Sequence, residues 1–395
     1  MSNTDQNHDS SPTGRRSLLT MPENHLDIVV TAGSIEPSRT ASTRTVLGAV
    51  IALPLFFLLT LTIAFVSAGH APKPHDMALT IAGSTSVTDQ IAESVADQAP
   101  NAFNITQTIS ASDARDAVKN RDAVGAVIID GQNVTTVIAS GGGKLATSVV
   151  QTAGQQIASS LGGTSTIEDV APLPPSDPGG TVLFFLLVIC TVGGFLPITA
   201  ISQAFPKART RSLVATAVGS GIVVPVIGFA VISIFVDYQV NFGTIAAVLG
   251  VGMIYCFTVG MLSTLFTKLL GNAAIFLQIL ILVALNFPSA GGTAPESMLP
   301  PFWQVLHNGW LGSGAFESMR GILFFDGGGV GHSMVQLLIW TAASIVLTIL
   351  VAARGKRTEE PAETVAGVPA TEQTAPVASA DASASTSGVA VGSAI

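Results

Sequence analysis

Six apolar runs, each about as long as a helix that crosses a bilayer, constrain this chain more than any other feature of its sequence. A hydrocarbon core about 30 Å thick needs roughly 20 consecutive apolar residues in a helix. Hydrophobic residues make up 48% of the chain and charged residues only 11%, which excludes an ordinary soluble enzyme. We therefore expect an α-helical integral membrane protein with six spans, at residues 46–66, 181–204, 213–236, 244–266, 269–287 and 334–353.

The distribution of Lys and Arg indicates how these runs are oriented. Basic residues precede the first run, follow the sixth, and lie in the connections between the second and third and between the fourth and fifth. The connection at 237–241 has none, and the segment 288–333 has only Arg320. Because basic loops stay on the cytoplasmic side, both termini of this multi-pass protein are expected in the cytoplasm.

The remaining segments predict a domain plan around the membrane spans. Residues 1–44 and 354–395 are polar or rich in Ala, Ser, Thr and Pro, and are expected to be disordered cytoplasmic segments. The first span, 45–67, is followed by an extracytoplasmic domain at 70–178. A five-span membrane domain then covers 181–353.

The segment 70–178 has the patterns of a small α/β domain inserted between the first two spans. Apolar residues at helical spacing lie between the strand-like stretches 77–83 and 103–110. Ser110 or Ser112 is suited to cap a following short helix, and Gly131–Gln132 separates two further strands as a hairpin turn. The expected order is β-α-β-α-β-β-α-β.

No pattern of catalytic or cofactor-binding residues is present in the sequence, and His70 and His75, with Asp76 beside them, are more typical of a polar linker than of a weak metal site. The stretch SGGGKLATS at 140–148 departs from a phosphate-binding loop, because Leu145 follows the lysine, and favours a glycine-rich turn entering a helix. Cys190 and Cys256 lie inside apolar runs, as buried hydrophobic residues do. The net charge of −8 argues against a nucleic-acid partner. We expect no enzyme, no cofactor and no metal.

The stretch FPSAGGTAPESMLPPFW at 287–303 interrupts this pattern with prolines and glycines at the outer end of the fifth span. Proline cannot continue a regular helix, so the chain must turn there. We interpret 288–333 as a re-entrant or interfacial cap built of short amphipathic pieces. Trp303 and Trp310 suit a membrane interface, and Glu317 and Arg320 are spaced to pair on one helix face. The candidate transport residues of this cap are Gly291, Gly292, Pro295, Glu296, Pro300, Trp303, Glu317 and Arg320.

Three motifs give the chain a resemblance to known membrane proteins. They are SDARDAVKNRDAVGAVIID at 112–130, DVAPLPPSDPGG at 169–180 and SAGGTAPESMLPPFWQVLHNGWLGSGAFESMR at 289–320. Together with the order of one span, an external domain and five spans, they resemble the membrane subunits of type-2 ABC exporters. The resemblance is to the phage-infection-protein (YhgE/Pip-like) branch, which is also similar to the EsaA-type accessory proteins of type VII secretion.

This resemblance implies export of a hydrophobic or cell-envelope substrate, with ATP hydrolysed by a separate subunit. It also implies a homodimer in membrane lipid, because such exporters use twelve spans. The turn with Lys207, Arg209 and Arg211 would be the cytoplasmic contact with the ATPase. The alternative is a scaffold or receptor that does not transport, whose external domain binds a secretion, cell-wall or phage partner.

Overall fold

The computed structural model describes residues 43–292 and 294–358. The chain divides into a unit that ends at Ala52 and a unit that begins at Leu53. Most of the two segments predicted to be disordered, 1–44 and 354–395, lies outside the described residues. Where they are described, the chain is helical: 43–44 begin α1 (Thr43–Gly69), and 354–358 complete α12 (Val330–Thr358).

Five helical stretches are long and apolar enough to cross a membrane, by length and composition. This agrees with a multi-pass membrane protein, but the number is one fewer than the six spans expected from sequence. The stretches are Ile51–Gly69 in α1, Val182–Ala204 (α5), Thr210–Phe235 (α6), the 48-residue stretch Phe242–Ser289, and Val330–Arg354 in α12.

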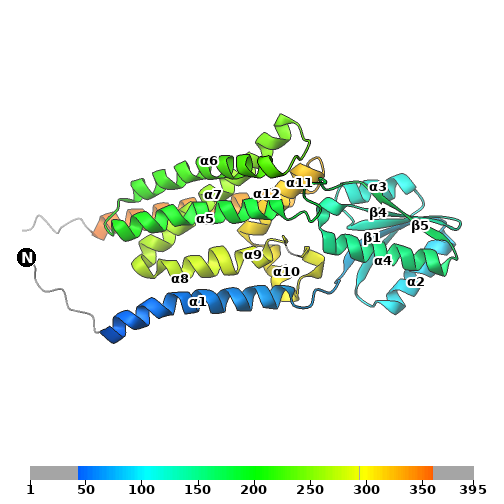
Figure 1. Cartoon of the computed structure of the whole chain (residues 1–395), viewed down its shortest axis with the longest axis horizontal. Helices are drawn as coiled ribbons and strands as arrows, with labels where there is room; N and C mark the ends of the chain where they lie inside the picture. The colour runs from blue at the N-terminus through cyan, green and yellow to red at the C-terminus, as the bar shows by residue number, and fades with distance from the viewer. Residues whose placement is uncertain (1–42, 293, 359–395) are drawn as a thin grey trace, which may run out of the picture. The chain divides into compact units, whose positions relative to one another are not determined.

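The difference arises because the predicted fourth and fifth spans form one apolar stretch. Helix α7 (Phe242–Leu270) runs past the expected turn at Thr267–Lys268, and the chain turns at Gly271, whose φ is +55°. The return is broken into short pieces: a 3-10 turn, α8 (Ala274–Gln278), the π-helix Ile279–Ala284 and α9 (Asn286–Ser289). No piece is long enough by itself to count as a span. Figure 1 shows α8 and α9 returning beside α7.

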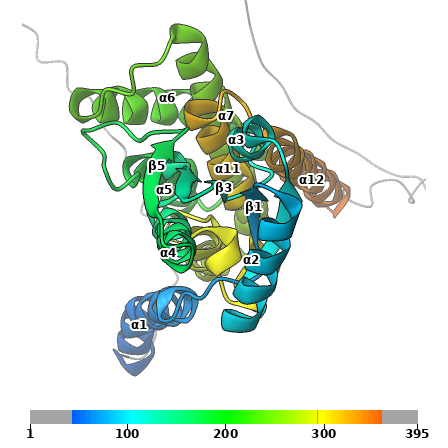
Figure 2. The same ribbon diagram turned by 90° about the vertical axis from the view of Figure 1, so that its right-hand side faces the viewer.

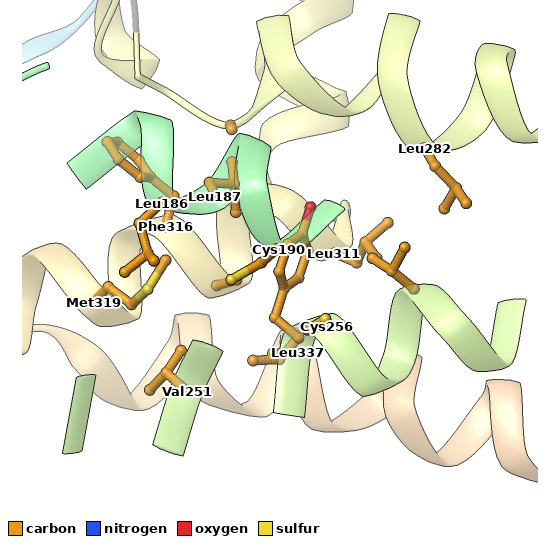
Figure 3. Packing of buried hydrophobic residues seen from close by; sticks show 14 of the residues in the cluster. Leu186, Leu187, Cys190, Val251, Cys256, Leu282, Leu311, Phe316, Met319 and Leu337 are labelled. Atoms are coloured by element: carbon orange, nitrogen blue, oxygen red, sulfur yellow. The ribbon is translucent and has the colours of Figure 1, made fainter. Parts of the chain in front are cut away.

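Helices α5, α6 and α7 form the centre of the bundle because small residues let their backbones approach closely. A Cβ atom added to Gly260 of α7 would lie 2.8 Å from the Cβ of Ala217 in α6, and one added to Gly194 of α5 would lie 2.8 Å from the Cys256 carbonyl oxygen. Both cysteines are free and buried, which confirms their prediction as small apolar groups. Figure 3 shows this core, formed by residues that include Leu186, Leu187, Cys190, Val251, Cys256, Leu282, Leu311, Phe316, Met319 and Leu337.

From Leu53 to Gly69, helix α1 lies at the margin of the other helices (Figure 2), and only Ala64 and Ala68 are buried in that part of it. It contacts the returning segment through Ala64 and Ala68, and Phe56 meets Phe276 of α8 edge to face. The apolar residues on its remaining faces are what a helix surrounded by lipid requires.

The region between α1 and α5 is an α/β domain whose element order confirms the predicted one. Its five strands lie in the order β2-β1-β3-β4-β5, all parallel except for the β3–β4 hairpin, where Asp130 pairs with Asn133. Helices α2 and α4 cover one face of the sheet, and α3 covers the other (Figure 1). The strands are β1 (Met77–Ala82), β2 (Phe103–Thr108), β3 (Gly125–Asp130), β4 (Asn133–Ile138) and β5 (Thr164–Asp169); the helices are α2 (Thr85–Gln98), α3 (Ala111–Lys119) and α4 (Lys144–Ser160).

Two predictions from short stretches of sequence within this domain are confirmed. The Ser110 hydroxyl accepts a hydrogen bond from the backbone N–H of Asp113 and so caps α3, as expected. The glycine-rich stretch at 140–143 forms a short 3-10 turn that enters α4 at Lys144, in agreement with the interpretation as a turn.

The predicted amphipathic cap at 288–333 is wrong for its longest helix, α11 (Leu311–Phe324). Twelve of the residues of α11 are buried, because it packs among α5, α7, α9 and α12. The shorter α10 (Pro301–His307) does have one buried and one exposed side: Trp303 is buried and Phe302 exposed. Trp303 is 3% exposed and donates a hydrogen bond to Ser67 of α1, and its position at a membrane interface stays a prediction.

Candidate functional site

A cavity of about 260 Å³ lies where the α/β domain meets the helices after α9, and we call it the junction cavity. The wall from the α/β domain is largely apolar, and the wall from the helical segments is largely polar. The first wall includes Val118, Arg121, Val124, Ala139 and Ala146; the second includes Glu296, Ser297, His307, Glu317, Arg320, His332 and Gln336.

Three charged side chains beside the cavity form a cluster, Arg121–Glu317–Arg320, in which Glu317 and Arg320 are buried and the side chain of Arg121 is 22% exposed. The guanidinium of Arg320 donates to Glu317 Oε1 at 2.7 Å, and that of Arg121 forms an ion pair with Glu317 Oε2. Arg320 also donates to the Gly291 carbonyl oxygen at 3.0 Å. The pairing of Glu317 with Arg320 confirms the prediction from their spacing, whereas Arg121 comes from a distant part of the sequence.

The chain holds Arg121 in place with an unusual backbone conformation. Arg121 follows α3 and has a φ of +68°, a region that residues other than glycine rarely occupy. Its side chain lies over the ring of Phe325, and the turn at 327–329 packs against it. A Cβ atom added to Gly328 would lie 2.8 Å from the Lys119 carbonyl oxygen, so only glycine allows this approach. The α/β domain is therefore attached to α11 through both backbone and charge.

The charge cluster makes the stability of the protein depend on pH in the acidic range. Burial raises the pKa of Glu317, but the charges of Arg320, Arg121 and His307 lower it more, so the pKa is held below its ordinary value of 4.5. A carboxylate with a lowered folded-state pKa contributes stability above its unfolded pKa and loses it as the pH falls through the folded value. We expect the melting temperature of the detergent-solubilised protein to exceed that of its Glu317→Gln variant by a constant amount above about pH 5. In stronger acid this difference should shrink toward zero. A difference that does not change with pH would contradict this.

A second set of hydrogen bonds joins α10, α11 and α12 behind the cavity. The amide of Gln336 donates to the carbonyl oxygens of His307 at 2.9 Å and Trp310 at 2.6 Å. The Ser313 hydroxyl also donates to the His307 carbonyl oxygen. His307 itself is 7% exposed, and its Nδ1 contacts the Ser289 carbonyl oxygen at 2.8 Å. These bonds provide partners for backbone carbonyl groups at the ends of the short helices. In a membrane environment, where water is scarce, those groups would otherwise have no partner.

Inside the bundle, six buried polar side chains form what we call the polar seam. The seam has two levels, and we call the one farther from the junction cavity the inner level. In the inner level, Thr199 donates to Gln278 Oε1 at 2.8 Å, and Gln278 Nε2 donates to Ser263 at 2.7 Å. In its outer level, Asn286 Nδ2 donates to the Tyr255 hydroxyl at 2.7 Å, and that hydroxyl donates to Thr191 at 2.6 Å. The seam consists of Thr191, Thr199, Tyr255, Ser263, Gln278 and Asn286.

The two levels of the seam follow the same helices. On each of the three contributing segments the two seam residues are eight positions apart, which corresponds to roughly 12 Å along a helix. Ser289 lies one helical turn beyond Asn286, and its carbonyl oxygen contacts His307 in the junction cavity wall. The outer level of the seam therefore lies one helical turn from a residue that contacts the cavity wall, and within the described chain no hydrogen bond joins the two levels.

The outer level has an unsatisfied acceptor. Asn286 is fully buried, and its Oδ1 has no hydrogen-bond partner. It follows the π-helix Ile279–Ala284, a local widening that often occurs at functional positions. A buried acceptor without a partner costs about 1–3 kcal/mol, so it needs a functional or structural reason.

The structure brings some of the predicted cap residues together and separates others. Pro295, Glu296, Glu317 and Arg320 line the junction cavity, and Gly291 lies against Glu317 and His307. Elsewhere, Gly292 packs on Phe184, Pro300 precedes α10, and Trp303 contacts α1.

The sequence reasoning missed Arg121, His307, Gln336 and the whole polar seam. Gln278 and Asn286 are polar residues within a predicted span, a signal that could have identified the seam. The involvement of Arg121 had no local signal.

The basic turn between α5 and α6 lies at the opposite end of these helices from the α/β domain (Figure 1). Lys207 and Arg209 line a hollow of about 650 Å³ there, together with exposed Phe205; Arg211 follows on α6. Lys268 donates to the Ala208 carbonyl oxygen at 2.7 Å and fixes the turn against α7.

Comparisons with known proteins identify no relative of this chain. No family model, no curated protein and no solved structure matches it. Among residues 43–292 and 294–358, no group of three or more His, Cys, Asp and Glu side chains is placed to hold a metal ion.

Proposed function

We propose that this chain is a permease-like membrane subunit of an exporter, in which the polar seam and the junction cavity form the substrate path. The observation that carries the proposal is the alignment of the two polar levels on the same three segments, with Ser289, one helical turn beyond Asn286, contacting His307 in the cavity wall. Buried polar groups inside a membrane bundle are costly, and in membrane proteins they commonly mark transport pathways.

The proposal includes a topology of six membrane passes. Gln278 pairs with Ser263 and Asn286 with Tyr255, so the segment 274–289 runs antiparallel to α7. If the segment 274–289 is counted as a pass, the chain has six passes and both termini lie on the same side of the membrane. The positively charged loops indicate that this side is the cytoplasm, so the α/β domain would lie outside.

The energy for export would come from ATP hydrolysed by a separate subunit, as the resemblance implies. The hollow at the α5–α6 turn, with exposed Phe205 beside Lys207 and Arg209, is the proposed contact for that subunit. The substrate would be a hydrophobic or cell-envelope molecule whose polar part follows the seam, and the working unit would be a homodimer in the bacterial plasma membrane.

Cysteine accessibility tests the path without knowledge of the substrate. Single cysteines would replace Thr191 and Ser263 in a chain carrying Cys190→Ala and Cys256→Ala, in energised cells that make the protein natively. If the seam is a path, a membrane-impermeant methanethiosulfonate reagent should label both from outside. Ile222, which is 52% exposed on α6, is the matched control and should stay unlabelled because it faces lipid.

Two further positions calibrate the assay. A cysteine at exposed Ser176 should be labelled from outside, and one at exposed Ser212 only after permeabilisation. Labelling of Ser176→Cys without labelling of Thr191→Cys and Ser263→Cys would overturn the permease proposal, and a reversal of the two calibration positions would overturn the topology.

A receptor or scaffold is the second candidate function, favoured by the exposed edges of the sheet. Ile109, just after edge strand β2, is 83% exposed, and Ile167 in edge strand β5 is 51% exposed. Edge strands with exposed apolar side chains can pair with an added strand of a partner. A seam closed to the thiol reagent, together with a partner that co-purifies with the protein but not with its Ile109→Lys variant, would establish this function instead.

A further inference from the structure

The charges that line the junction cavity are of both signs. The cluster Arg121–Glu317–Arg320 contains two guanidinium groups and one carboxylate, so it retains one positive charge. Glu296 contributes a negative charge to the same cavity. Its Oε1 accepts a hydrogen bond from the Asn308 amide at 2.5 Å, and within the described part of the chain it forms no ion pair.

Two polar atoms in the cavity wall lack partners, which points to a guest that forms hydrogen bonds. His307 Nδ1 contacts a carbonyl oxygen, which only accepts, so Nδ1 carries the proton; Nε2 has no hydrogen bond in the described chain and remains accessible to solvent, in a side chain that is 7% exposed. The Ser297 hydroxyl is also buried and has no partner. Both residues line the cavity.

The wall of the cavity that comes from the α/β domain is largely apolar and limits the size of the ligand. Val118, Val124 and Ala146 contribute it from the α/β domain. A volume of about 260 Å³ is slightly below the usual range for drug-sized ligands, and it fits a small polar head group with a short apolar part.

We propose that the junction cavity binds a zwitterionic head group, with its phosphate or carboxylate toward Arg121 and Arg320 and its primary ammonium at Glu296. The His307 Nε2 and the Ser297 hydroxyl supply further hydrogen bonds to the same ligand. This deepens the proposed function and rests on it, because it identifies the substrate class as an amphiphile with a zwitterionic head.

Binding of a soluble head group to the purified full chain in nanodiscs tests this. The probe is glycerophosphoethanolamine, measured by titration calorimetry, with glycerophosphate and ethanolamine as its two halves. We expect saturable binding of the zwitterion and at least tenfold weaker binding of each half, since either half leaves one charge of the cavity unpaired. Equal affinity for the zwitterion and glycerophosphate would reduce the cavity to an anion site and overturn the proposal.

Two conservative variants locate the binding. Glu296→Gln keeps the acceptor for Asn308 and removes the charge, so it should weaken binding of the zwitterion about tenfold and leave glycerophosphate unaffected. His307→Asn retains an N–H donor near the position of Nδ1 and removes Nε2, so it should also weaken the zwitterion. Glu93→Gln, at an exposed position on α2, is the matched control and should bind like the unmodified protein.

The outcomes separate this inference from the proposed function. If Glu296→Gln binds the zwitterion like the unmodified protein, the inference is wrong even when the seam cysteines are labelled. If the zwitterion binds in the expected manner but the seam cysteines stay unlabelled, the cavity is a receptor site, and the export proposal fails along with the assignment of the ligand as a substrate.

Discussion

Replacing Glu317 by alanine is expected to lower the free energy of unfolding by about 3–5 kcal/mol, the largest effect of any single charge change in the described chain. Glu317 is the shared partner of Arg121 and Arg320, and the side chain of Arg320 is 7% exposed. Removing the carboxylate leaves the buried guanidinium of Arg320 and the partly exposed guanidinium of Arg121 without a counter-charge. The measurement is thermal melting in detergent, at a pH near neutral where Glu317 is ionised.

The chain offers a matched control for this experiment in a second ion pair. Arg115 and Glu168 bond at 2.8 Å in the α/β domain, but their side chains are 34% and 37% exposed. Because water screens such a pair, Glu168→Gln should cost no more than about 1 kcal/mol. Adding Arg320→Met to Glu317→Ala should recover part of the loss, since one unpaired charge is then removed. Equal effects of the two single substitutions would show that the charge cluster contributes no more than a surface pair.

Replacing Gly312 by alanine is expected to destabilise the bundle by about 1–3 kcal/mol through overpacking. A Cβ atom there would lie 2.3 Å from Asn286 Oδ1 and 2.8 Å from its Cγ. The Asn286 side chain cannot easily move aside, because its amide is bonded to Tyr255. Gly219→Ala is the control: its Cβ would meet nothing within 4 Å, so alanine should be neutral or slightly stabilising in that helix.

A double substitution tests whether Asn286 is the cause. If the clash between Cβ and the Asn286 amide accounts for the loss, Asn286→Ala should make Gly312→Ala less harmful than it is alone. Melting of the four proteins of this cycle in detergent provides the coupling energy. Additive losses would show that Gly312 is required for another reason and that Asn286 does not hold α11 in place.

The predictions that succeeded depend on residues close together in the sequence. Alternation and helical spacing indicated the element order of the α/β domain, the cap at Ser110 and the hairpin at Gly131–Gln132. The pairing of Glu317 with Arg320 follows from one turn of helix. In each case a backbone hydrogen bond or a spacing of three residues determines the outcome, so neighbouring residues carry the information.

The predictions that failed concern segments with similar composition but different surroundings. The returning segment 274–289 is as apolar as a regular span, yet it breaks into α, π and short helical pieces. Hydropathy measures transfer from water and does not distinguish a span that faces lipid from one that packs on α7 and α11. For the same reason α11, with its two charges, was expected at a surface, although Glu317 and Arg320 pair with each other and Glu317 also pairs with Arg121 from another domain.

The sequence by itself determined that the protein has long apolar helices, an α/β domain between the first two of them, and a proline- and glycine-rich break after the fifth apolar run. These properties follow from composition and short-range spacing, which act before any distant contact forms. Only the tertiary structure decided that Arg121 meets Glu317 across 196 positions and that six polar residues from three segments form one seam. Such contacts depend on how the helices pack, because the cost of burying each polar group is offset only by a partner that the fold brings to it.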